Sequence, residues 1–164
     1  MRTLAEMAPG TIQWRRALNS HDWTLDLGAE RVAAIHILPP ILAPRANGEL
    51  FGRSWSLAPR NLMQTRLVFT YAADSDESIE YTRPPLRWGW VRGSDGGNYR
   101  FKQTYLTHDV VLSNEGGRWL LATQYGGSAL VSLSLSEEAR EEASIDRLVL
   151  LALYLNLTAW SGGL

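Results

Sequence analysis

The chain has 164 residues, of which 45% are hydrophobic and 20% are charged, a composition that fits one globular domain and excludes wholesale disorder. Its formal net charge of −1 gives no general electrostatic attraction to nucleic acid, so we expect no nucleic-acid partner. The absence of cysteine excludes disulfides, thiolate metal sites, a cysteine nucleophile and S-palmitoylation, and it fits a reducing, cytoplasmic location.

From residue 11 onward, apolar and polar residues alternate in short runs, which is the pattern of half-buried β-strands. The clearest run has Val131, Leu133 and Leu135 interleaved with serines. Turn signals separate the runs, among them Asn47-Gly48 and Asp95-Gly96-Gly97. The alternation predicts strands near residues 11–16, 22–27, 31–38, 48–52, 53–58, 65–72, 78–83, 86–92, 98–104, 108–113, 118–125 and 129–135.

Two loops inside this succession have a distinctive composition. The acidic residues Asp74, Asp76, Glu77 and Glu80 are interpreted as a solvated hairpin loop. Residues 37–42 are apolar and are followed or interrupted by prolines, so they form either a contact for a partner or a cover over one end of the domain.

After the last predicted strand, the pattern changes from strand to helix. Residues 136–143 form an acidic, exposed connector, and Ser144 is a suitable N-cap with Asp146 in the first helical turn. A helix over about 144–160 follows, and from Leu148 it is apolar nearly all round, which predicts burial on every side. Its apolar stretch reaches only about 20 Å, too short for a hydrocarbon layer of about 30 Å, so we expect no transmembrane segment.

Together these elements predict one mainly β domain over residues 1–164, an antiparallel barrel of about twelve strands enclosing a hydrophobic C-terminal helix. A barrel wider than about eight strands leaves an interior that must be filled, and a helix of about 10–12 Å diameter suits that interior.

The layout resembles the tubby C-terminal-like superfamily, which includes phospholipid scramblases and LURP-one-related proteins. The residues that carry the resemblance are Ser144–Tyr154, similar to the closing helix of that family, and Gly52–Leu57 and Tyr99–Lys102, similar to two of its strands. The resemblance implies a twelve-stranded barrel threaded by a hydrophobic helix, and it implies binding to lipid.

The chain also departs from that superfamily in its functional motifs. Scramblases carry a cysteine-rich palmitoylation stretch and an acidic calcium segment, whereas this chain has no cysteine and its acidic run at 137–142 lacks the pattern of a calcium loop. Tubby proteins bind phosphoinositides through a basic pocket, and no lysine-rich equivalent is evident. Scrambling activity is therefore not expected.

No constellation of catalytic residues stands out in the sequence. The histidines His21, His36 and His108 have no metal-ligand spacing, and the nucleophile elbow, the phosphate-binding loop and the dinucleotide-binding glycine motif are all missing. We therefore expect neither catalysis nor a metal or other cofactor.

The candidate binding residues form an arginine- and tryptophan-rich stretch. They are Arg83, Arg87, Trp88, Trp90, Arg92, Arg100 and Lys102. In one interpretation these residues meet anionic lipid headgroups, since tryptophan suits a membrane interface and arginine attracts anionic lipid. In the other, which alternation favours, Trp88 and Trp90 point into the barrel and Arg87 faces water.

Two classes of function remain open. The first is a non-catalytic tubby-like or LURP-one-like domain that binds a lipid headgroup, an anionic membrane surface or a protein partner, and that lies in the cytoplasm or peripherally on a membrane. The second is a small-ligand carrier or an enzyme that uses a barrel cavity, as lipocalin-type folds do. A helix that fills the barrel favours the first class.

Overall fold

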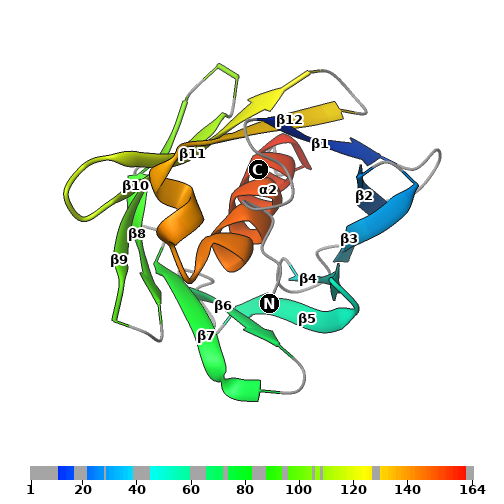
Figure 1. The fold of residues 1–164 in the computed structure, drawn as a ribbon, viewed down its shortest axis with the longest axis horizontal. Coiled ribbons are helices and arrows are strands. Elements are labelled where there is room, and N and C mark those ends of the chain that lie inside the picture. The colour runs from blue at the N-terminus through cyan, green and yellow to red at the C-terminus, as the bar shows by residue number, and fades with distance from the viewer. Residues whose placement is uncertain are drawn as a thin grey trace.

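A computed structural model describes residues 11–16, 22–27, 29–38, 45–59, 66–71, 74–82, 88–93, 96–104, 106–107, 109–126 and 130–161. Its strands form one closed antiparallel barrel in which each strand pairs with its neighbours in sequence and the first strand pairs with the last. Figure 1 shows the ring of strands surrounding a single long helix. The predicted fold class is therefore confirmed.

The barrel has twelve strands in the part of the chain that the structure describes. Their bounds are β1 Thr11–Arg16, β2 Asp22–Leu27, β3 Glu30–Leu38, β4 Arg45–Leu50, β5 Arg53–Pro59, β6 Arg66–Tyr71, β7 Asp74–Thr82, β8 Trp88–Gly93, β9 Asn98–Gln103, β10 Val110–Asn114, β11 Trp119–Tyr125 and β12 Leu130–Leu135. Two helical elements follow, a short 3₁₀-helix η1 at Glu138–Glu141 and the helix α2 at Ile145–Ser161.

Alternation along the strands divides the side chains between the barrel interior and its outer surface. In β12, Val131 and Leu133 are fully buried while the serines between them are partly exposed. In β9, Tyr99 and Phe101 are buried while Arg100 and Lys102 are exposed. Period-two alternation of this kind lets one set of apolar side chains line the interior of a closed sheet.

Helix α2 fills that interior. Every residue from Leu148 to Leu157 is buried, and these residues occupy all faces of the helix. The side chains of Leu150, Leu151, Leu153, Leu155 and Leu157, which the sequence predicts to be buried, are at most 7% exposed. Because a helix inside a barrel has no solvent side, it is apolar all round instead of amphipathic.

Gly48 has a different structural role from the one that the sequence indicates. The Asn47-Gly48 pair lies within β4, and the turn between β4 and β5 is made by Phe51 and Gly52, both with positive φ. Two central residues of positive φ match the right-handed twist of a hairpin. Gly48 pairs with Trp55, and a side chain there would collide with the Trp55 ring. The glycine therefore makes room for an inward-facing aromatic side chain.

The prediction of a hairpin loop over the acidic residues 74–80 is wrong. Residues Asp74–Thr82 form strand β7, which pairs with both β6 and β8. The register between β6 and β7 shifts after Thr70, so β7 carries extra residues near its start. Such an irregularity breaks the polar and apolar alternation on which strand prediction depends.

Hydrogen bonds connect α2 and the segment just before it to the barrel wall. Thr123 Oγ1 on β11 accepts the Asn156 Nδ2 group at 3.1 Å and the Val110 backbone N–H at 2.8 Å. Near the start of the helix, the Tyr99 hydroxyl donates to Glu142 Oε1 at 2.5 Å. These bonds fix the rotation and depth of a helix whose apolar surface alone would permit several positions.

We expect Thr123→Val to destabilise the protein by roughly 2–3 kcal/mol, because an isosteric side chain without an oxygen leaves two buried donors without this acceptor. Urea denaturation checks the value. Thr24→Val on β2 is the matched control, since Thr24 is only half-buried. Equal losses of stability in the two variants would show that the Thr123 bonds contribute nothing specific.

Candidate functional site on the outer face of β8 to β11

One row of outward side chains crosses the barrel wall from β7 to β11. Strand register aligns Thr82 with Trp90, Trp90 with Arg100, Arg100 with Ser113, and Ser113 with Trp119. Trp90 is 43% exposed and Trp119 is 47% exposed. The row therefore places an arginine between two solvent-exposed tryptophans.

The interpretation that Trp90 points into the barrel is wrong. On β8 it is Gly89 and Val91 that face inward, and Val91 is fully buried. Gly89 pairs with Phe101, whose ring packs edge-on against Tyr81 at 5.2 Å between centroids. A glycine thus holds the inward position opposite Phe101, and the bulky Trp90 lies outside.

Arg100 lies over the face of the Trp90 ring. Its Cζ atom is 5.0 Å from the ring centroid, within the range of a cation–π interaction. Arg92 and Lys102 are exposed on the same face, on β8 and β9. Among the described residues, none forms an ion pair with Arg92, Arg100 or Lys102. Three cationic side chains are thus available to an external anionic group.

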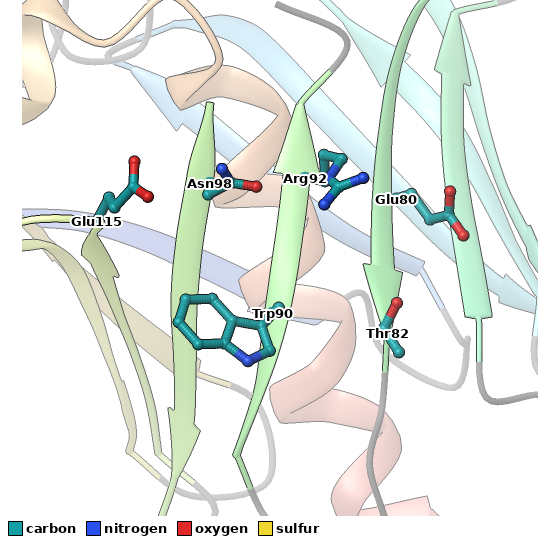
Figure 2. A pocket seen from close by; sticks show the side chains of 6 residues that line it. All are labelled: Glu80, Thr82, Trp90, Arg92, Asn98 and Glu115. Carbon is teal, nitrogen blue, oxygen red and sulfur yellow. The ribbon is translucent and has the colours of Figure 1, made fainter. Parts of the chain in front are cut away.

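A hollow of about 520 Å³ lies beside this row, toward the turn between β8 and β9. Figure 2 shows its six lining side chains on the outer side of the sheet, with helix α2 behind the strands. They are Glu80, Thr82, Trp90, Arg92, Asn98 and Glu115. The hollow mixes two carboxylates with one arginine, so it is less basic than the surface around Arg100 and Lys102.

The structure places some of the predicted residues and leaves others undescribed. Trp90, Arg92, Arg100 and Lys102 come together on the outer face of β8 and β9. Arg83 and Arg87 lie outside the described residues, as does the side chain of Trp88. Sequence reasoning missed Trp119, because a bulge between Leu112 and Ser113 changes the parity of β11 relative to β10.

Leu106 was also missed and is 91% exposed at the tip of the β9–β10 hairpin. The hairpin is held by Thr104, whose N–H donates to Asp109 O at 2.9 Å and whose Oγ1 accepts the Asp109 N–H at 3.0 Å. Thr104 and Thr107 also share a hydroxyl hydrogen bond of 2.6 Å. A turn with several internal hydrogen bonds therefore exposes Leu106 to solvent, beyond Lys102 at the end of β9.

One histidine pairs with a carboxylate elsewhere on the barrel wall. His36 Nδ1 contacts Asp22 Oδ1 across β2 and β3, with both side chains about half exposed. Within the described ranges, no group of three His, Asp or Glu side chains is positioned to hold a metal ion. In the same part of the chain, no helix combines the length and the apolar character needed to cross a membrane.

The fold defines a twelve-stranded antiparallel barrel built around a C-terminal helix, and one solved structure has a similar arrangement. It is the X-ray structure of a protein from Arabidopsis thaliana, AT5G01750, which superposes with a TM-score of 0.56 over 94% of this chain and 93% of that chain. The sequences are 11% identical, so the likeness shows the fold alone. No family model and no curated protein matches the sequence.

Proposed function

We propose that this protein is a non-catalytic, tubby-like barrel domain that binds anionic membrane surfaces peripherally, in the cytoplasm, through the outer face of β8 to β11. The observation that supports the proposal most directly is the group of three cations, Arg92, Arg100 and Lys102, that form no ion pair with the described residues. Arg100 is also placed over an exposed tryptophan.

The chemistry of this face suits the boundary between headgroups and acyl chains. Tryptophan rings such as Trp90 and Trp119 are amphipathic and favour that boundary, where arginine and lysine attract anionic headgroups. Each basic residue close to an anionic surface contributes about 1 kcal/mol. Three such residues give salt-sensitive binding of moderate strength, in keeping with a protein whose net charge is −1.

The distribution of acidic residues indicates which end of the outer face of β8 to β11 would approach an anionic membrane. Glu80 and Glu115 line the hollow near the β8–β9 turn, whereas Lys102 lies at the other end of β9, toward Leu106. An anionic membrane repels the acidic end and attracts the basic end. The exposed Leu106 would then be the first apolar side chain to enter the lipid layer.

The packing of the barrel argues against the alternative function of a small-ligand carrier. The inward side chains of the strands and the residues of α2 form one buried core. A lipocalin-type carrier needs an open interior, and here a helix occupies that position.

Vesicle flotation tests the proposal. We expect the wild-type protein to float with phosphatidylcholine vesicles that contain phosphatidylserine at low ionic strength, and to be released by added salt. Arg92→Glu/Arg100→Glu should weaken the binding by at least about 30-fold, because two contributions of about 1 kcal/mol are removed. Its thermal unfolding should stay close to that of the wild type, since both side chains face water.

The matched control is Arg15→Glu/Arg16→Glu on β1, which makes the same change in net charge at exposed positions four strands away from Arg100 on β9 in the closed strand order. This variant should keep most of the vesicle binding. Equal losses in the two variants would mean that net charge, and not this face, controls binding. A wild-type protein that stays with the unbound fraction at low salt would rule out the membrane and leave a protein partner.

A further inference from the structure

The hollow beside Trp90 has a lining that the proposed membrane-binding face uses only in part. It has a volume of about 520 Å³ and opens on the outer side of the sheet. Trp90 and Arg92 belong to both surfaces, whereas the other lining side chains supply carboxylates, an amide and a hydroxyl. These are Glu80 and Thr82 on β7, Asn98 on β9, and Glu115 in the β10–β11 turn.

Strand register arranges the lining in two adjacent rows. Glu80, Arg92 and Asn98 are cross-strand neighbours in one row, and Trp90 lies in the next. Figure 2 shows Glu115 extending the first row beyond Asn98. Neighbouring strands are about 4.8 Å apart, and residues i and i+2 of a strand are about 7 Å apart, so polar groups border the Trp90 ring over an area of roughly 7 by 10 Å.

Three of the polar side chains in this lining are available to an external molecule. Within the part of the chain that the structure describes, the side chains of Arg92, Asn98 and Glu115 form no hydrogen bond or ion pair. No ion pair joins Arg92 to Glu80, although the two residues are directly opposite on neighbouring strands. Trp90 is 43% exposed beside them. Donors, acceptors and an aromatic surface are thus open to a ligand.

The mixture of charges restricts the chemistry of that ligand. An anion in the hollow is repelled by the carboxylates of Glu80 and Glu115, and a cation is repelled by Arg92. An apolar molecule would remove these polar groups from water without replacing their hydrogen bonds. A hydroxyl group both donates and accepts, so it can bridge a carboxylate and a neighbouring guanidinium or amide. A neutral molecule with several hydroxyl groups meets all of these conditions.

We propose that the hollow binds a neutral sugar in its pyranose form. Arg92 and Asn98 donate hydrogen bonds to hydroxyl oxygens, and the Glu115 carboxylate accepts hydrogen bonds from hydroxyl groups. The C–H groups of a pyranose ring carry a slight positive charge and pack against the negative π-face of the exposed Trp90 indole. The sugar site does not depend on binding to anionic membranes, because Asn98 and Glu115 contribute no positive charge.

NMR titration of the full chain with the methyl pyranosides of glucose, galactose and mannose tests the proposal. With at least one of these sugars, we expect the Trp90 indole N–H and the Asn98 side-chain amide to shift, with a dissociation constant of roughly 1–10 mM. Asn98→Ala/Glu115→Gln should weaken this binding by at least about tenfold, because two hydrogen bonds to the sugar are lost. The matched control, Asn47→Ala/Glu49→Gln, makes the same two changes at exposed positions on β4 and should bind like the wild type.

Charged analogues and glycolipid vesicles complete the test. Glucuronic acid and glucosamine should bind more weakly than the best neutral sugar, because each meets a like charge in the hollow. Flotation with phosphatidylcholine vesicles that carry a neutral glycolipid with this sugar as its headgroup identifies the source: flotation assigns the sugar to a lipid, and its absence assigns it to a soluble saccharide. A wild-type spectrum unchanged by all three neutral sugars would overturn the proposal, as would equal weakening in the two double variants. Neither result affects flotation with phosphatidylserine vesicles, so failure of the sugar site and failure of the membrane-binding face are distinguishable.

Discussion

Leu151→Asp should abolish soluble folding of the protein. Leu151 is fully buried on α2, so the variant loses about 2–3 kcal/mol of hydrophobic burial and places an unpaired carboxylate in the core at a further cost of several kcal/mol. The sum is comparable with the whole stability of a typical domain, about 5–15 kcal/mol. We expect the variant to appear in the insoluble fraction after expression.

Leu106→Asp is the matched control for this prediction, because it makes the same chemical change at a leucine that is 91% exposed. The control should remain soluble and unfold cooperatively at a Tm close to that of the wild type. Soluble Leu151→Asp protein with a cooperative thermal transition would contradict the assignment of α2 as the filling of the barrel.

Gly48→Ala should lower the stability by at least about 3 kcal/mol and the Tm by roughly 6–12 °C. A Cβ atom at this position would lie 2.0 Å from the carbonyl oxygen of Ala34 and 2.8 Å from Cζ2 of Trp55. The first contact is with the backbone of the neighbouring strand, which cannot move without disturbing the hydrogen bonds between β3 and β4. Thermal unfolding followed by circular dichroism measures the shift.

Gly116→Ala provides the comparison, since Gly116 lies in the exposed β10–β11 turn and its added Cβ would be 3.4 Å from Asn114 Oδ1. Its Tm should change by at most a degree or two. If the two alanine variants unfold at the same temperature, the close approach of β3 to β4 at Gly48 is not a constraint on the fold.

Much of the fold could be predicted because two simple patterns dominate this sequence. Alternation predicts β9 at 98–104 and β11 at 118–125, and the structure has them at Asn98–Gln103 and Trp119–Tyr125. The uniformly apolar run after Leu148 has only one physical solution, burial on all sides, and this implies a barrel wide enough to hold a helix.

Two of the errors concern glycines that lie inside strands. Gly48 was predicted to lie in a turn, yet it sits on an inward strand position that pairs with Trp55, and Gly89 sits on an inward position that pairs with Phe101. The pairing joins residues of different strands, so neighbouring sequence does not reveal it. Aromatic rings over strand glycines are a known way of filling sheet surfaces.

The candidate site was only partly predictable for a related reason. Hydrophobicity assigns Trp90 to the interior and Gly89 to the exterior, and the structure has the reverse. Trp119 joins the same face only because of the bulge in the β10–β11 pair. Residues 100 and 102, by contrast, alternate regularly with the buried Tyr99 and Phe101, and their outward positions follow from sequence alone.

The pairing of β1 with β12 has a consequence for how the molecule folds and unfolds. Trp14 is opposite Val131, so the contact that closes the ring joins segments from nearly opposite parts of the chain. Contacts between residues so far apart in the sequence are slow to form, because a long loop must close before the contacts stabilise the fold. Because the ladder between β1 and β12 closes the ring, we expect the barrel to refold slowly compared with a helical domain of the same length.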